Sequence, residues 1–194
     1  MERLNLGCVV MAAGNARRFG TNKLAAELDG RSLIRRALEA IPAEAFHSVV
    51  VVTQYQEIAD LAQEFHFTPI RNHHPEFGIS HTIRLGLSAL TECDGALFLV
   101  SDQPLLRRES VEELVGFWRQ QPEKIAALSH GGIRGNPCLF PARFFPELME
   151  LREDRGGNTV IRRHEDCLVL LEVEARELTD VDTPEAMAQV QKNG

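Results

Sequence analysis

The alternation of continuous apolar runs with amphipathic segments is the feature that most constrains this fold. Runs without a polar face cover LGCVVMAA (6–13), SVVVVT (48–53) and GALFLV (95–100), as is typical of strands buried on both sides. We expect helices where apolar side chains recur at helical spacing, over 32–41, 56–65, 80–90, 109–121 and 182–192. Shorter strands are expected over 67–72, 124–129, 137–140 and 167–173. This order predicts an α/β fold with a mixed, mostly parallel sheet between two helical layers.

Composition excludes several classes of protein. The 194 residues carry a net charge of -7, which argues against nucleic-acid and membrane-surface binding. No run approaches the roughly 18 apolar residues of a membrane span, and the first residues do not resemble a signal peptide. The four cysteines are far apart and form no CxxC pair, which predicts reduced thiols in a cytoplasmic protein. Without repeats or linkers, residues 1–194 are expected to form one domain.

A basic loop, AAGNARRFGTNK, follows the first predicted strand. In parallel sheets ligands bind at the carboxyl ends of the strands. Gly14 and Gly20 would allow backbone N–H groups to turn toward phosphate oxygens, with charge from Arg17, Arg18 and Lys23. The loop is neither a Walker A motif nor GxGxxG. A phosphate cradle and an ordinary solvated turn are both compatible with it.

Carboxylates follow the other predicted strands. Asp102 lies in SDQP directly after the third buried run, and Asp180 and Asp182 alternate in TDVDTPEA. Mg²⁺ prefers one or two carboxylates together with substrate phosphate oxygens, so Asp102 and Asp182 are candidate ligands. The alternative is that these residues cap turns and helices. Thr183 is expected to cap the last helix.

The segment HHPEFGISHTIRLG (73–86) carries several polar residues at a loop-to-helix junction. The adjacent His73 and His74 are more typical of a solvated loop than of a metal site, because no third ligand is nearby. Ser80 and Thr82 are expected to be N-caps. The functional alternative is that this junction contacts a base or a second substrate.

These segments, in this order, resemble the MobA-like nucleotidyltransferases, most closely the molybdenum cofactor cytidylyltransferase branch. The family pattern LAAGxSxRMGxxK stands here as MAAGNARRFGTNK, with Ala16 in place of the serine. The segments GISHTIRLGL, SDQP and DVDTPEA match further family motifs. Two segments depart from the family: Asn136 in GNPCLF replaces a histidine, and Asn158 in EDRGGN replaces an arginine.

The resemblance implies a Rossmann-like three-layer nucleotidyltransferase fold, Mg²⁺ as cofactor and a nucleoside triphosphate as substrate. The second alanine of MAAG is similar to the cytidylyl-type loop, which favours CTP. The implied reaction transfers CMP to the terminal phosphate of the molybdenum-pterin cofactor and releases pyrophosphate. The implied catalytic residues are Arg18, Lys23 and Asp102, and the implied metal ligands are Asp102 and Asp182. The nucleotide would contact Ala12, Ala13, Gly14, Arg18, Gly20, Lys23, Ser80 and Arg84, and the second substrate Asn136, Asp154 and Asn158.

The sequence is also compatible with two other functions. The departures at Ala16, Asn136 and Asn158 are compatible with an accessory protein that binds the molybdenum cofactor and delivers it to a molybdenum hydroxylase. A nucleotidyltransferase that acts on a sugar phosphate or an alditol phosphate is the other alternative. An anionic phosphate nucleophile needs no general base, so the lack of a Ser/His/Asp constellation does not count against transfer.

Overall fold

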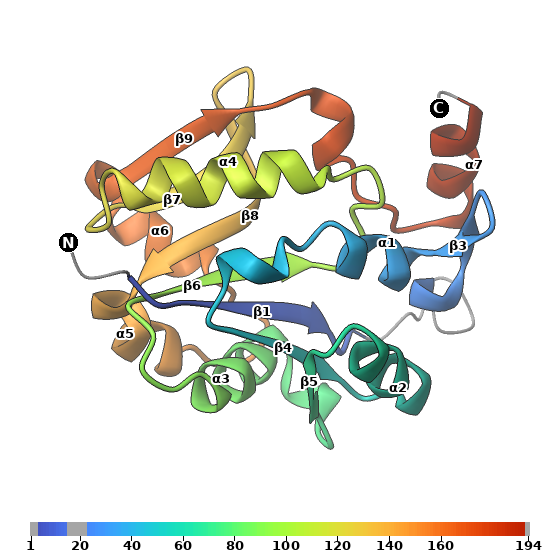
Figure 1. The fold of residues 1–194 in the computed structure, drawn as a ribbon, viewed down its shortest axis with the longest axis horizontal. Coiled ribbons are helices and arrows are strands. Elements are labelled where there is room, and N and C mark those ends of the chain that lie inside the picture. The colour runs from blue at the N-terminus through green and yellow to red at the C-terminus, as the bar shows by residue number, and fades with distance from the viewer. Residues whose placement is uncertain (1–3, 15–22, 193–194) are drawn as a thin grey trace.

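A mixed seven-stranded sheet forms the centre of the protein (Figure 1). The computed structural model describes residues 4–14 and 23–192. The strand order is β5-β4-β1-β6-β8-β7-β9, and β8 alone runs antiparallel to its neighbours β6 and β7. The bounds are β1 Leu6–Ala12, β4 Ser48–Thr53, β5 Thr68–Arg71, β6 Gly95–Val100, β7 Ile125–His130, β8 Ile133–Pro141 and β9 Leu168–Glu172. The expected mixed, mostly parallel sheet is confirmed.

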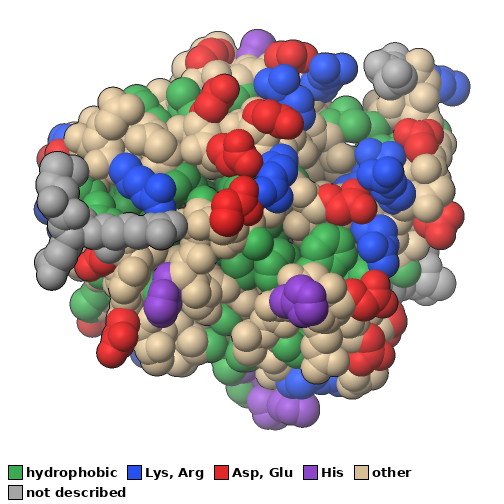
Figure 2. All heavy atoms as spheres, viewed as in Figure 1, with side chains coloured by type: hydrophobic (Ala, Val, Ile, Leu, Met, Phe, Trp, Pro, Cys, Tyr) green, Lys and Arg blue, Asp and Glu red, His purple; other side chains and the backbone are tan. Residues whose placement is uncertain are grey.

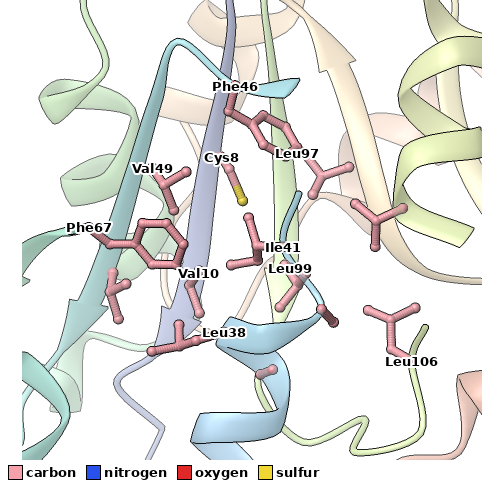
Figure 3. Packing of buried hydrophobic residues seen from close by; sticks show 14 of the residues in the cluster. Cys8, Val10, Leu38, Ile41, Phe46, Val49, Phe67, Leu97, Leu99 and Leu106 are labelled. Atoms are coloured by element: carbon pink, nitrogen blue, oxygen red, sulfur yellow. The ribbon is translucent and has the colours of Figure 1, made fainter. Parts of the chain in front are cut away.

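Helices cover both faces of this sheet. One buried cluster joins the strands to α1 (Leu33–Glu39), α2 (Gln56–Glu64) and α4 (Arg108–Arg119). Figure 3 shows part of it, where Leu38 and Ile41 lie against Val10 and Leu99 of the sheet. A second cluster joins the opposite face to α3 (Ile79–Ala89), α5 (Phe145–Met149) and α6 (Asn158–Arg163). The three-layer α/β/α arrangement is therefore as expected.

A small third cluster closes one end of the molecule. Helix α7 (Pro184–Lys192) buries Met187 and Val190 against a hairpin formed by β2 (Glu27–Leu28) and β3 (Arg31–Ser32). The Ala186 N–H donates to Thr183 Oγ1 at 3.1 Å, so Thr183 caps α7 as expected. None of the helices among the described residues combines the length and the hydropathy of a membrane span.

The expected N-caps at Ser80 and Thr82 are wrong. Helix α3 begins one residue before Ser80, after Gly78, whose φ of 81° favours glycine. The Ser80 N–H donates to the Glu153 carbonyl, so main chain from a distant loop satisfies a donor that a cap would otherwise satisfy. Both side chains are buried instead, and Thr82 Oγ1 accepts a hydrogen bond from Asn72.

Candidate active site

The sheet brings the predicted loops to one edge. Met11 pairs with Val100 in the parallel register of β1 and β6, so the segments that follow both strands leave the sheet side by side. Ala12 and Ala13 are buried, and Gly14 is exposed with open space where a Cβ would lie. Gln54 donates to the Ala13 carbonyl at 3.0 Å, which fixes the start of the basic loop. Ala16, Arg17, Arg18 and Gly20 lie outside the described residues.

Lys23 joins two of the predicted carboxylates. Its Nζ lies 3.1 Å from Asp102 Oδ2 and 2.8 Å from Asp182 Oδ1. The Val181 N–H also donates to the Asp102 carbonyl at 2.8 Å, so the two acidic segments are tied by their main chains. Burial opposes the charge on Lys23, but the hydrogen bonds and charges of Asp182 and Asp102 outweigh it and raise the Lys23 pKa. The ammonium group is therefore cationic at neutral pH.

Asp180 has a different environment from Asp182. Gln103 Nε2 donates to Asp180 Oδ1 at 3.0 Å and lies 3.3 Å from the Leu178 carbonyl. Burial and the nearby Asp102 charge raise the pKa of Asp180. Of the two alternating carboxylates, Asp182 is thus the one that shares Lys23 with Asp102.

The donor set suits a hard divalent cation. Asp102 and Asp182 carry half-exposed or exposed carboxylate oxygens that converge on one point, and both are anionic oxygen ligands. Among the described residues no three His, Cys, Asp or Glu side chains form a complete protein-only metal site. A cation here would need further ligands from a substrate, which is how Mg²⁺ is usually held at phosphate-transfer sites. The residues present therefore fit Mg²⁺ bound together with a triphosphate.

A buried carboxylate that the sequence analysis missed holds this edge together. The Glu177 side chain is fully buried and accepts from the Arg107 N–H at 3.1 Å and from Arg107 Nε at 3.0 Å. It thereby ties the segment before Asp180 to the loop after Asp102. A glutamate in the polar stretch EARELTD gives no sign of burial, so only the fold identifies it.

A cavity of about 380 Å³ lies beside these groups, between β6, β8, α3 and α6. Its wall includes Met11 and Val100, the residues at which β1 and β6 reach the sheet edge. The three predicted second-substrate residues, Asn136, Asp154 and Asn158, all line it. The cavity also has an apolar part, formed by Ile79, Ile83, Phe98, Cys138, Phe140, Leu148 and Ile161.

Ser80 and Arg84, which the sequence predicts as nucleotide contacts, lie outside the lining of this cavity. Ser80 is fully buried, and its Oγ has no hydrogen-bond partner among the described residues. Arg84 donates to the Leu151 carbonyl. Neither residue lines the cavity. Three arginines that the sequence analysis did not single out do line it: Arg134, Arg155 and Arg162.

Known proteins with related sequences and folds support this picture. The chain is 28% identical over 197 residues to the purine catabolism protein PucB of Bacillus subtilis, covering 95% of each chain. Rv0371c of Mycobacterium tuberculosis superposes with a TM-score of 0.83 at 19% identity, over 99% of this chain and 100% of the other, and it has also been solved with manganese. CMP:2-keto-3-deoxy-manno-octonic acid synthetase, solved with CTP, superposes with a TM-score of 0.75 at 17% identity, over 97% and 98%. Residues 8–167 match the MobA-like NTP transferase domain, and the chain therefore belongs to that family.

Proposed function

We propose that this nucleotidyltransferase transfers CMP from CTP to the terminal phosphate of the molybdenum-pterin cofactor in a Mg²⁺-dependent reaction. The observation that carries the proposal is the Lys23–Asp102–Asp182 cluster, which lies at the sheet edge beside the cavity lined by Asn136, Asp154 and Asn158. The CTP complex of a protein with the same fold supports the choice of nucleotide. The resemblance of the loop and of the SDQP and DVDTPEA segments supports the choice of acceptor.

The chain's own residues would bind and neutralise the triphosphate. The N–H groups of the loop after β1, together with Arg18, would bind the β- and γ-phosphates, and Lys23 would stabilise charge at the α-phosphate. Asp102 and Asp182 would hold Mg²⁺, which when bound supplies further charge neutralisation to the phosphate oxygens. Arg18 lies outside the described residues, so its role rests on the sequence alone.

The chemical step needs alignment more than proton transfer. An oxygen of the acceptor phosphate forms the bond to the α-phosphorus, and the bond from that phosphorus to the β-bridging oxygen breaks. The electron pair of the broken bond leaves with pyrophosphate, and no general base is required because the attacking phosphate oxygen is already anionic. Holding the acceptor in the cavity converts the attack into a step within one complex, which is a large source of rate.

The cavity favours a flat acceptor over a polyhydroxyl one. Met11, Phe98 and Phe140 present no hydrogen-bond partners for sugar hydroxyls, and a hydroxyl buried without a partner loses stability. The side chains of Asn136, Asp154 and Asn158 offer amide and carboxylate partners to the amino, carbonyl and ring-nitrogen groups at the edge of a pterin. The apolar walls therefore favour a ring over a sugar phosphate or an alditol phosphate, which would use only the polar part of the lining.

The proposal also covers the location of the protein, its domain organisation and the recipient of its product. The four cysteines are free thiols, which suits the reducing cytoplasm that we propose as its location. We also propose that residues 1–194 work as one nucleotidyltransferase domain. A molybdenum hydroxylase is the proposed recipient of the product.

A pyrophosphate-release assay tests the proposal. CTP, ATP and GTP are each offered with Mg²⁺ and either the molybdenum-pterin cofactor or a sugar phosphate. We expect turnover with CTP and the pterin, and a loss of about 10²–10³-fold in Lys23→Ala and in Asp102→Asn. Near wild-type turnover in both variants would show that the cluster is not the catalytic site. Binding of CTP and pterin without turnover would instead favour the accessory protein that delivers the cofactor.

A further inference from the structure

Three arginines without an ion-pair partner gather around one cavity, whereas seven of the twelve other arginines in the described part of the chain form ion pairs. These seven pair with Asp or Glu, for example Arg107 with Glu177 and Arg163 with Glu147. On the face shown in Figure 2, basic and acidic side chains accordingly lie next to one another. Arg134, Arg155 and Arg162 form no ion pair with any described carboxylate. Positive charge is thus left uncompensated around one cavity of an acidic protein.

Arg134 gives the strongest support for an anion site, because it is half-buried while Arg155 and Arg162 are exposed. Its guanidinium lies 3.6 Å from Cys138 Sγ. Burial raises the pKa of Cys138, so this thiol stays uncharged and gives Arg134 no counter-charge. A partly desolvated cation without an anion is unfavourable in the free protein, and an anionic ligand would relieve that cost.

The other two arginines come from the opposite wall. Arg155 lies in the loop before α6. Arg162 lies on α6, four residues after Asn158, so Asn158 and Arg162 share the helix face that lines the cavity. The neighbouring Arg163 instead pairs with Glu147, with 3.5 Å between Nη1 and Oε2, and does not line the cavity. The cavity is therefore charged from two sides, and Asp154 is its one lining carboxylate.

We propose that Arg134, Arg155 and Arg162 form an anion-recognition site whose ligand is a phosphate monoester dianion carried on a flat ring system. The inference rests on the proposed function in treating the cavity as the acceptor's site, and it assigns the residues that select the acceptor. Three guanidinium groups and one carboxylate leave two positive charges, which match a dianion. The apolar walls formed by Phe98 and Phe140 then contact the ring.

A binding experiment with 1-naphthyl phosphate tests the site directly. The probe's fluorescence is followed as the full chain is titrated, with 1-naphthol and glucose 1-phosphate as probes that lack the charge or the ring. We expect Arg134→Gln, Arg155→Gln and Arg162→Gln each to weaken binding about tenfold or more, because each removes a charge-assisted hydrogen bond. Added salt should weaken wild-type binding. The matched variant Arg163→Gln should bind the probe like the wild type.

Further outcomes separate this site from the triphosphate loop and from the transfer reaction. Lys23→Met should keep its affinity for 1-naphthyl phosphate, because Lys23 does not line the cavity. Wild-type affinity in both Arg155→Gln and Arg162→Gln, or equally tight binding of glucose 1-phosphate, would overturn the proposal even if CMP transfer is observed. Arginine-dependent binding of the probe by a chain that releases no pyrophosphate with any acceptor would uphold the anion site and reject the proposed function.

Discussion

At the scale of single residues, Lys23 links the two acidic segments of the candidate active site, those that carry Asp102 and Asp182. One ammonium group contacts two carboxylates that are far apart in the chain, and it offsets one of their two negative charges. The same group is the one proposed to stabilise charge at the α-phosphate. Binding of a metal and a triphosphate must therefore redistribute the contacts of Lys23, because the carboxylates and the phosphate compete for it.

Replacing Lys23 with methionine exposes this competition. Without the ammonium, Asp102 and Asp182 repel each other and have no counter-charge, so we expect Lys23→Met to bind free Mn²⁺ more tightly than the wild type does. The same variant should lose transfer activity. Electron paramagnetic resonance of unbound Mn²⁺ measures the affinity, with Lys124→Met as the control because Lys124 donates to the Asp166 carbonyl. Equal or weaker Mn²⁺ binding in Lys23→Met would contradict this account.

At the scale of elements, the connections between segments position the carboxylates. The loop after β6 carries Asp102 and Gln103, and the segment before α7 carries Glu177, Asp180 and Asp182. Gln103 and Arg107 both donate across this junction. The segment that carries Asp182, the second proposed metal ligand, is therefore held by side chains as well as by the main-chain bond from Val181 to Asp102.

Glu177→Gln tests the contribution of this junction to stability. The amide keeps the shape of the side chain but weakens two hydrogen bonds to Arg107, one of them with a charged donor. We expect the free energy of unfolding to fall by about 1–3 kcal/mol. Urea denaturation measures it. Glu174→Gln is the matched control, because Glu174 pairs with Arg176 at the surface, where such pairs contribute about 0–1 kcal/mol. Equal effects in the two variants would rule out a special role for Glu177.

The long buried strands could be predicted from the sequence, but the short helices and the start of β8 could not. The runs 48–53 and 95–100 became strands with those bounds, because continuous burial leaves an unmistakable apolar pattern. Helices α5 and α6 were missed, since each is shorter than two full turns and shows little periodicity. Strand β8 extends beyond the expected 137–140 to include Arg134, whose polar neighbourhood resembles a loop. That extension placed Arg134 in the cavity, which the sequence could not indicate.

At the scale of the whole molecule, the helices on the two faces of the sheet carry glycines in opposite settings. Gly86 of α3 lies directly against Val9 of β1, and a Cβ there would overlap the valine side chain. Gly116 of α4 faces open space. Two helical glycines thus have different roles: one permits a close approach to the sheet, and the other contributes nothing to packing.

Substituting alanine at the two positions should give effects of opposite sign. Gly86→Ala forces α3 away from the sheet, and we expect it to lower the free energy of unfolding by about 1–3 kcal/mol. Gly116→Ala improves helix propensity at an exposed position and should raise it by about 0.5–1 kcal/mol. Thermal and urea unfolding of the two variants measure both values. Stabilisation by Gly86→Ala would mean that α3 does not contact the sheet this closely.

The sequence predicts the overall architecture better than the cavity. Alternating strands and helices suffice for a three-layer fold, and parallel strands place loop residues at one edge. The convergence of Arg134 with Arg155 and Arg162 depends instead on the antiparallel direction of β8, which brings the start of that strand to the carboxyl edge of β6. The two walls of the cavity come from distant parts of the chain, so no local sequence pattern can indicate that they meet.

The ion pair between Lys23 and Asp182 spans 159 positions of the chain. Because a ribosome makes the amino end first, Lys23 and Asp102 are synthesised long before their shared partner. A growing chain can complete most of the sheet while its active site still lacks one carboxylate. Premature termination or proteolysis before residue 180 therefore leaves a fragment that has the basic loop and lacks Asp182, the second of the two proposed metal ligands.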